Sequence, residues 1–559
     1  MPVPFPPRLV AGLAAAALAA PLGVLGTGPS SAEPASDPLA AVAARAGLSV
    51  AATHEVLAED ETATVRDGRL VYTEPAAPVA ARTTADATSA RVAPLESTFA
   101  LHSNPGAALT ILLDVDGTTA AEQVIGSAWS LTVQGAHPAW DPAGDGPAFS
   151  DAELARVQEV WARVAEDFAA FDVDVTTEDP GTDALVRTDT ADTRYGTRVL
   201  ITPSVGAYAE LCTRGCGGLA FVGTFAATGG RHQPAWVFPQ GTGGSAKSVA
   251  EAASHEAGHN LGLTHDGDTT SSYSRGQGVW APIMGVGYYR PLTQWSRGDY
   301  PGATNTQDDL AILVGRLGLR ADEAPSLPAD ATPVFSTGGL TTDGLTTDGG
   351  GAVVAAGVIG TSDDVDAWAL GTCAAGAQVR VAAPSDGTDL DVRARLVRST
   401  DPGSPLVTAA PTATAARGVV EGLDATLSVP EAGEAWVLLV DGVGEGSWSD
   451  GGYDDYASLG SYEVSVTGCG DALRPARPGR PRVRVRADGS VVVAWRGAGD
   501  TGAPVLAYRL GGTAERTRAS PDVRRVVLAA PAPGTHRVRV VAIGEHGTTA
   551  GRWRRYQTG

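Results

Sequence analysis

Three of the nine histidines in this 559-residue chain fall within the stretch HEAGHNLGLTHD at 255–266. The alanines, glutamate and leucines around them favour a helix, so His255 and His259 would lie one turn apart on one face. Two imidazoles on one helix face can bind one metal ion. Glu256 directly follows the first histidine, and this places its carboxylate beside the metal, where it can polarise a bound water.

A glycine and a third histidine complete the pattern. Gly262 suits the left-handed conformation that ends a helix, and the resulting reversal would bring His265 back as a third ligand. Three neutral protein ligands leave one position of a zinc ion open for water, whose pKa falls to about 7 on zinc. This spacing therefore predicts a catalytic zinc site. The alternative, three histidines on a polar helix surface, leaves the placed glycine and glutamate unexplained.

The neighbouring sequence predicts the elements that would position this motif. The stretch SDAELARVQEVWARVAEDFAAF, residues 150–171, has apolar side chains three and four positions apart and predicts a helix that Ser150 and Asp151 can cap. ALTILLDVDG predicts a buried strand, and four further strands are predicted before the motif, in VDVTTED, TRVLITP, GGLAFVGTF and PAWVFPQ. This mixture predicts an α+β domain over residues 98–320.

The extended motif HExxHxxGxxH resembles that of the metzincin clan of zinc endopeptidases, and His265 followed by Asp266 is similar to its adamalysin or reprolysin branch. The clan has a methionine turn beneath the zinc. Besides Met1 this chain has only Met284, nineteen residues after the third histidine. GGLAFVGTF at 217–225 looks like the clan's edge strand, to which an extended substrate adds by backbone pairing.

The resemblance implies a zinc metalloendopeptidase with His255, His259 and His265 as zinc ligands. Glu256 would take a proton from the zinc-activated water and return it to the leaving amine. Two other functions stay open: a zinc hydrolase of a non-peptide substrate, and a non-enzymatic secreted adhesion protein with a degenerate protease domain. The intact glutamate argues against the second, because a binding protein has no use for a general base.

The chain departs from the clan in two respects. Some members have a tyrosine ligand two positions after the methionine, but Val286 stands there, so we expect Tyr288 and Tyr289 to line the cleft. Many relatives hold latency with a propeptide cysteine on the zinc, but no cysteine precedes Cys212. If this chain is latent, His54 or a carboxylate would have to cap the metal instead.

The N-terminal residues predict export. A short stretch ending at Arg8 and the apolar run LVAGLAAAALAAPLGVLG predict a signal peptide over 1–32 that is cleaved after Ala32. A membrane anchor is the alternative, which Pro21 and three glycines disfavour. Residues 33–97 lack cysteine and predict a propeptide with one strand-like segment, ATVRDGRLVYTE. We therefore expect a secreted, extracellular protein.

Four cysteines agree with export, since an even number suits two disulfides in an oxidising compartment. Their spacing favours pairing of near with near, Cys212 with Cys216 and Cys373 with Cys469. The CxxxC pair is also able to bind zinc, but the chain has no second such pair to complete a four-thiolate site.

A linker over 321–352, with the low-complexity run STGGLTTDGLTTDGGG, leads to two predicted all-β sandwich modules. Residues 353–470 resemble the bacterial prepeptidase C-terminal β-sandwich. Five aspartates there are candidates for calcium binding, although surface loops are their commoner setting because no EF-hand spacing is present. These aspartates are Asp363, Asp364, Asp366, Asp389 and Asp391.

Residues 471–559 resemble a fibronectin type III domain, with Trp495 as its core tryptophan and His536 where that family usually has a tyrosine. This module holds 17 Arg against 6 Asp and Glu, a net charge of +11, whereas the whole chain carries −22. The basic surface would either contact an acidic polymer or cell surface, or only keep the module soluble. For the whole protein we expect a protein or peptide substrate, no nucleic-acid partner and no membrane span.

Overall fold

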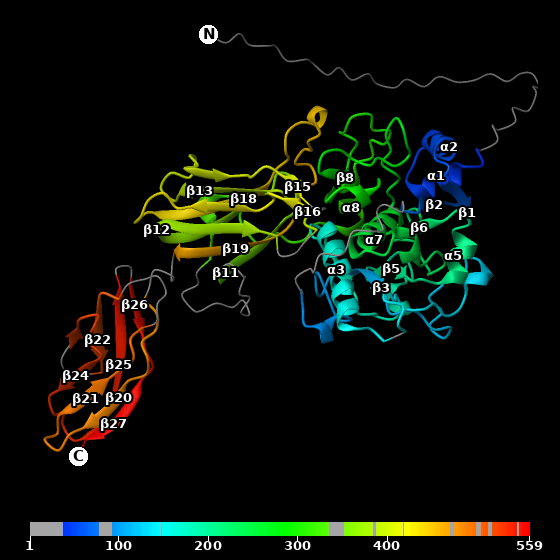
Figure 1. Ribbon diagram of the computed structural model, residues 1–559. Coiled ribbons are helices and arrows are strands. Elements are labelled where there is room, and N and C mark those ends of the chain that lie inside the picture. The colour runs from blue at the N-terminus through cyan, green and yellow to red at the C-terminus, as the bar shows by residue number, and fades with distance from the viewer. Residues whose placement is uncertain are drawn as a thin grey trace, which may run out of the picture.

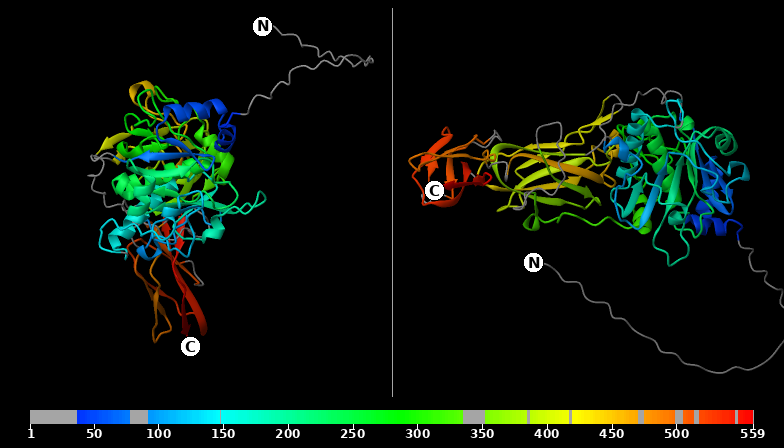
Figure 2. Two further views of the ribbon diagram at one scale, coloured as in Figure 1. Left: turned by 90° about the vertical axis from the view of Figure 1, so that its right-hand side faces the viewer. Right: turned by 90° about the horizontal axis from the view of Figure 1, so that it is seen from below.

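Ten stretches of the chain are described by the computed structural model: 37–77, 92–146, 148–334, 352–383, 387–416, 419–469, 475–498, 505–512, 517–544 and 547–558. The predicted signal peptide lies outside them. Three units lie in a row, a mixed α/β unit followed by two β-rich ones (Figures 1 and 2). This mixed architecture with β-rich modules agrees with the predicted fold class. Among the described helices, none combines the length and apolar character needed to cross a bilayer.

The first unit is built on a seven-stranded sheet in the order β1-β2-β6-β7-β5-β3-β4. The strands β3, β4, β5 and β7 run parallel to their neighbours among themselves, whereas β6 runs antiparallel to both β7 and β2. All five strands predicted before the motif are present. The bounds are β1 Ala63–Arg66, β2 Arg69–Pro75, β3 Leu109–Asp114, β4 Val173–Thr176, β5 Tyr195–Ile201, β6 Cys216–Phe221 and β7 Ala235–Val237.

Two long helices lie in the core of this unit. In α3, Asp151–Asp167, the Ser150 side chain accepts a hydrogen bond from the backbone of Glu153, whose carboxylate bonds back to Ser150, so a full capping box starts the helix. α7, Ala246–Leu261, is buried along almost its whole length. Gly262 ends it in the left-handed region, with φ 116°, as the sequence predicted. The shorter helices are α4 Thr182–Leu185, α5 Val205–Leu211, α6 Pro239–Thr242 and α8 Asp309–Leu317.

Residues 37–77, hereafter the N-terminal segment, fall within the predicted propeptide and pack against this unit. They form the helices α1, Ala40–Ala46, and α2, Val50–Glu59, followed by the hairpin β1–β2. Asp67 and Gly68 both have positive φ, as the tight turn of a two-residue hairpin requires. Leu70 and Tyr72 of β2 are fully buried, in a cluster that includes Val222 beyond β6. The segment is therefore joined to the sheet by both backbone and side chains.

The second unit is a β-sandwich whose main sheet has the strand order β11-β19-β12-β18-β13-β14. Cys373 and Cys469 face each other on β12 and β19 and are disulfide-bonded, as are Cys212 and Cys216, so both predicted pairings are confirmed. The short strand β10, from the predicted linker, pairs with β12. The bounds are β10 Thr332–Pro333, β11 Ala352–Ile359, β12 Asp366–Ala382, β13 Val392–Arg398, β14 Val407–Ala409, β15 Thr414–Ala416, β16 Val419–Glu421, β17 Ala425–Ser428, β18 Ala435–Gly442 and β19 Gly460–Cys469.

The third unit has a three-stranded and a five-stranded sheet. Trp495 lies in its buried cluster, as predicted for a core tryptophan, while His536 stands opposite Tyr556 of a neighbouring strand. The bounds are β20 Arg482–Val485, β21 Val491–Ala494, β22 Ala507–Gly511, β23 Arg518–Ala519, β24 Arg525–Leu528, β25 Gly534–Gly544, β26 Gly547–Ala550 and β27 Arg554–Thr558.

The mixed unit and the β-sandwich meet through polar groups that are largely buried. Glu166, at the end of α3, accepts hydrogen bonds from the backbone N–H of Ser461 (2.9 Å) and the hydroxyl of Thr388 (3.2 Å). The Tyr456 hydroxyl donates to Asp308 (2.7 Å) at the start of α8. This interface, hereafter the sandwich contact, fixes the second unit against the helices of the first.

Candidate metal centre

The three predicted ligand histidines converge. Helix α7 places His255 and His259 one turn apart, and the reversal after Gly262 returns His265 to them. The Nε2 atom of His259 lies 3.1 Å from the Nε2 atoms of both other histidines. All three rings are buried. The structure thus brings together the residues that the sequence motif selected.

The outer nitrogen of each ring has an oxygen partner. Nδ1 of His255 lies 2.8 Å from the Ile283 carbonyl, and Nδ1 of His259 lies 2.9 Å from the Leu263 carbonyl. Carbonyl oxygens only accept hydrogen bonds, so these Nδ1 atoms carry the protons and the Nε2 lone pairs face one another. Burial also lowers the pKa of His259, which favours its neutral form.

Facing lone pairs repel unless a cation lies between them. Two ligand atoms at the usual 2.0–2.1 Å from a tetrahedral zinc ion are about 3.3 Å apart, close to the 3.1 Å seen here. Hydrogen-bonded Nδ1 atoms are also the usual support of metal-binding imidazoles. The donor set therefore fits zinc, with His255, His259 and His265 as its protein ligands.

Glu256 is fully buried, and neither of its carboxylate oxygens has a hydrogen-bond partner within the described residues. A Cβ atom on Gly218 of β6 would lie 2.3 Å from Glu256 Oε1, so only glycine at that position lets the strand pass this close. Burial raises the pKa of Glu256 well above its usual value, and the negative charge of Glu74 adds to the rise. An unpaired carboxylate with a raised pKa is suited to accept a proton.

Met284 is fully buried beneath helix α7, where the sequence placed the methionine turn. A Cβ atom on Gly258 would lie 2.6 Å from its sulfur, so the thioether packs against the helix between the two ligand turns. The Met284 carbonyl accepts the backbone N–H of Asp266 (2.8 Å). This turn therefore holds the chain on both sides of the third histidine.

The two tyrosines after the methionine have separate surroundings. The Tyr288 hydroxyl would lie 2.9 Å from a Cβ atom on Gly217, so this side chain borders β6. The ring of Tyr289 lies under the guanidinium of Arg275, 5.1 Å from its centre.

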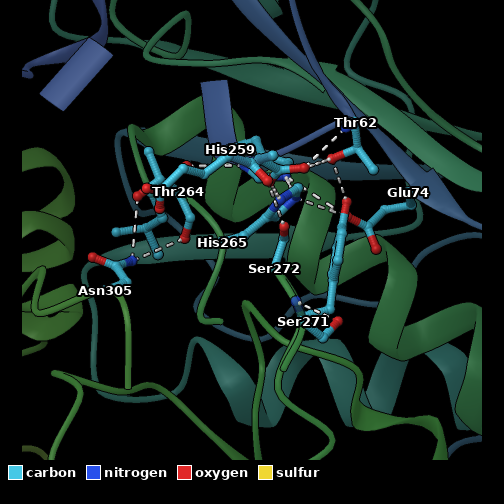
Figure 3. A network of polar contacts seen from close by, with 12 residues as sticks. Thr62, Glu74, His259, Thr264, His265, Ser271, Ser272 and Asn305 are labelled. Carbon is cyan, nitrogen blue, oxygen red and sulfur yellow. Dashed lines mark hydrogen bonds and ion pairs between the residues drawn. The ribbon is translucent and has the colours of Figure 1, made fainter. Parts of the chain in front are cut away.

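Sequence reasoning missed Glu74 of strand β2, the fourth member of the His-rich group that is able to hold a metal. Its Oε1 atom lies 2.7 Å from Nε2 of His255, 3.0 Å from Nε2 of His265 and 4.0 Å from Nε2 of His259. Figure 3 shows Glu74 and His265 approaching each other from opposite sides. Nothing local distinguishes this glutamate from the other acidic residues; the strand-like stretch ATVRDGRLVYTE predicted only that a strand lies here.

Further residues of the N-terminal segment surround His265. Its Nδ1 donates to Asp60 Oδ2 (2.6 Å), and Asp60 also accepts the hydroxyl of Thr62, which lies 2.9 Å from the Tyr273 hydroxyl. The ring of Tyr72 lies 3.9 Å from that of His265, centre to centre. His54, the histidine considered as a cap, is exposed on α2 and bonds to Asp37 (2.8 Å), so that hypothesis is wrong.

The aspartates considered for calcium do not gather at one place. Asp364 and Asp366 lie near Asp322, with carboxylate oxygens within 4.8 Å of one another, while Asp363 is exposed. Asp366 is fully buried and accepts the hydroxyl of Tyr462, so the expectation of a surface loop is wrong for this residue.

The other two aspartates are also buried, contrary to the surface-loop expectation. Asp389 lies beside Asp167 of α3, in the sandwich contact. Asp391 accepts the hydroxyl of Tyr453 (2.7 Å). Each of these carboxylates thus has its own partner, and the five do not form one calcium site.

Part of the mixed unit is similar to a known family of peptidases. The profile of "Metallo-peptidase family M12B Reprolysin-like" matches residues 174–266, from β4 to the aspartate after the third histidine. No curated protein matches the chain. The match supports a metallopeptidase domain over these residues, and that family implies a zinc ion and a protein or peptide substrate.

Similar solved structures cover only small parts of the chain. A fibronectin type III domain of human collagen XX is 22% identical, covers 15% of this chain and 91% of its own, and has a TM-score of 0.13. The sixth fibronectin type III domain of human fibronectin type III domain containing protein 3 is 22% identical. The match covers 15% of this chain and 85% of that domain, with a TM-score of 0.14. The spore cortex lytic enzyme SleM of Clostridium perfringens is 9% identical. The match covers 19% of this chain and 34% of the enzyme, with a TM-score of 0.14. TM-scores this low carry no argument, so the identity of both C-terminal modules stays a prediction.

Proposed function

We propose that this protein is a secreted zinc metalloendopeptidase in which His255, His259 and His265 hold the metal and Glu256 is the general base. One observation carries the proposal: three imidazole lone pairs converge within a reprolysin-like region, next to a buried carboxylate that has no partner. Two disulfides support secretion, because such bonds persist in oxidising compartments.

When bound, zinc supplies a Lewis acid that polarises a carbonyl and acidifies water. The hydrogen bonds from the histidine Nδ1 atoms fix the three rings so that their Nε2 atoms face one point. Glu256 accepts a proton from the attacking water at its carboxylate and then donates it to the leaving amine. Burial raises the pKa of Glu256, which favours its protonated form between these two transfers.

Strand β6 provides the binding edge for the substrate. A peptide that pairs with this strand is held in an extended conformation, with its backbone beside the general base. Gly217 and Gly218 leave room for that approach, because neither carries a side chain. An extended binding mode of this kind suits an endopeptidase acting on unfolded or flexible protein segments.

The variant Glu256→Gln tests the proposal. It keeps the shape of the side chain, so we expect one zinc per chain. After the N-terminal segment has been removed from variant and wild type alike, casein cleavage should be lower in the variant by at least about 100-fold. Glu210→Gln, at an exposed position on α5, is the control and should match the wild type. Near-normal cleavage by a zinc-loaded Glu256→Gln protein would remove Glu256 from the mechanism. Mass spectrometry of the casein fragments distinguishes internal peptide cleavage from hydrolysis of a non-peptide substrate.

A further inference from the structure

The N-terminal segment crosses the metal centre as an added strand. Strand β2 runs antiparallel to β6, with Val71 opposite Phe221 and Thr73 opposite Leu219. Beyond the centre, the backbone N–H of Ala77 donates to the Gly241 carbonyl (2.8 Å). The edge of β6 on which a substrate would pair is thus already occupied by the chain itself.

A bulge in this pairing marks the position of Glu74. From Thr73 to Pro75 the strand β2 advances by two residues, while β6 moves from Leu219 to Cys216, one residue more. The extra residue belongs to the glycine pair of β6. Bulges re-aim side chains, and here the bulge lies where the Glu74 carboxylate meets the three histidines.

Glu74 Oε1 has the position of a metal ligand. The Nδ1 protons of His255 and His259 are already donated to backbone carbonyls, so their Nε2 atoms have lone pairs but no proton to give. Glu74 is buried, and apart from the histidines its carboxylate is hydrogen-bonded to the side chain of Tyr273. Its distances of 2.7, 3.0 and 4.0 Å to the three nitrogens bracket the roughly 3.3 Å between ligands of one tetrahedral ion.

Two other side chains hold the segment in this position. Asp60 accepts the Nδ1 proton of His265, and the Tyr72 ring stacks on His259 with 4.6 Å between ring centres. Tyr72 therefore covers His259, Asp60 orients His265, and Glu74 lies at the metal centre itself. A flexible tail resting near the site would not make these three buried contacts together.

Resting on the proposed peptidase function, we propose that Glu74 is the fourth ligand of the metal and that the hairpin β1–β2 closes the peptidase site from within the chain. The carboxylate takes the place that water needs, and β2 takes the place of the substrate strand. This arrangement supplies the latency for which the chain has no cysteine upstream of Cys212.

The test uses the full-length zinc-loaded chain and a peptide hydroxamate, an extended probe whose end group binds zinc at two oxygens. Calorimetry measures its affinity for the wild type, Glu74→Gln and Glu74→Asp. Glu55→Gln, an exposed glutamate on α2, is the matched control. Zinc content and amide exchange of β2 show whether each variant keeps the metal and the folded segment.

We expect Glu74→Gln to bind the hydroxamate at least about 10-fold more tightly than the wild type, because the competing closed state is less populated. Glu74→Asp keeps the charge, so its hydroxamate affinity should lie between those of the wild type and Glu74→Gln. The affinity of the control should equal that of the wild type. In the cobalt-substituted chain, the visible absorption should change with Glu74→Gln and not with Glu55→Gln.

Equal hydroxamate affinities for the wild type and Glu74→Gln, with one zinc in each, would overturn the role of Glu74 and leave the peptidase proposal standing. A cobalt spectrum unaffected by Glu74→Gln would also overturn it. A wild-type chain that takes up no zinc would overturn the proposed function and this inference with it. If the Glu74→Gln chain shows faster amide exchange in β2 together with a higher hydroxamate affinity, the closure is supported. Loss of the carboxylate is expected to open the hairpin.

Discussion

The mixed unit meets the rest of the chain through two buried interfaces, and these neutralise their carboxylates in different ways. At the metal centre, Asp60 and Glu74 of the N-terminal segment face imidazole nitrogens. In the sandwich contact, Glu166 has only neutral donors, and Asp167 faces Asp389.

The pKa values of Glu166 and Asp167 in the sandwich contact reflect burial without a cationic partner. Burial raises the pKa of Glu166 to about 7. Burial, with the charge of Glu251 added, raises that of Asp167 to about 8. The one cation nearby on α7, Lys247, pairs with Glu251. With zinc bound as proposed, the first interface depends on a cation, whereas the second depends on bound protons. Different conditions should therefore open them.

The largest expected effect comes from removing one metal ligand. Removing a hydrogen-bond partner of a metal-binding histidine already costs about 10–100-fold in metal affinity, so His259→Ala should weaken zinc binding by at least about 100-fold. Without the ion, amide exchange in β2 should rise while exchange in β12 and β19 stays the same. Zinc competition with a chelator and exchange mass spectrometry measure both. Equal loosening of the two interfaces would show that they are not independent.

A polar residue in place of Met284, beneath the metal centre, should weaken the contact with the N-terminal segment and leave the sandwich contact unchanged. Met284→Ser removes buried apolar volume under α7 and should cost about 2–5 kcal/mol in the free energy of unfolding. Met284→Leu nearly conserves volume and should cost less than about 1.5 kcal/mol. Denaturant unfolding of both variants, with zinc competition alongside, checks this. If the serine variant holds zinc as tightly as the wild type, the methionine does not support the site.

The sandwich contact should respond to pH. Glu166 has a pKa of about 7 in the folded chain against 4.5 as its ordinary value, so the folded state favours its protonated form. Its stabilisation is complete below pH 4.5 and is lost as the pH rises through 7, with a loss of at most about 3 kcal/mol. The metal interface has the opposite sense, since histidine ligands lose metal in acid.

Glu166→Gln removes this titration. Its free energy of unfolding should fall less than that of the wild type between pH 4.5 and 8, measured with urea at each pH. Glu210→Gln, exposed on α5, should keep the wild-type dependence. An identical pH dependence for Glu166→Gln and the wild type would show that the buried carboxylate does not drive the loss.

The smallest expected effect serves as a reference for both interfaces. Ser150→Ala removes the capping box of α3 and should lower the free energy of unfolding by about 1 kcal/mol. It touches neither the histidines nor the sandwich contact. Zinc affinity and the pH dependence should therefore be those of the wild type, and a change in either would mean that general destabilisation explains the other variants.

The sequence was informative where the chemistry is local. Helix α7, Gly262 and the three histidines follow from one short stretch, because ligand spacing and helix periodicity are set over a few residues. Met284 could be placed only through a family resemblance, since it lies outside that stretch. These residues converge in the structure as expected.

The same reasoning failed where segments distant in the chain meet. Asp60 and His265 are 205 residues apart, and their contact depends on the pairing of β2 with β6, which no local pattern reveals. Asp366, Asp389 and Asp391 were expected on surface loops because the sequence has no EF-hand spacing. Their partners, a tyrosine or another carboxyl, come from other strands and helices and were not visible in the sequence.

Strand β6 has one more consequence, which concerns aggregation. Without the hairpin, its free edge would present unpaired N–H and C=O groups, and its two glycines offer no bulk or charge to keep another strand away. Such an edge is a template for pairing between copies of the chain. The hairpin is made before β6 during synthesis and is available to cover that edge as soon as it forms. The pairing of β2 with β6, which excludes a peptide from the site, should also reduce aggregation of newly synthesised chains.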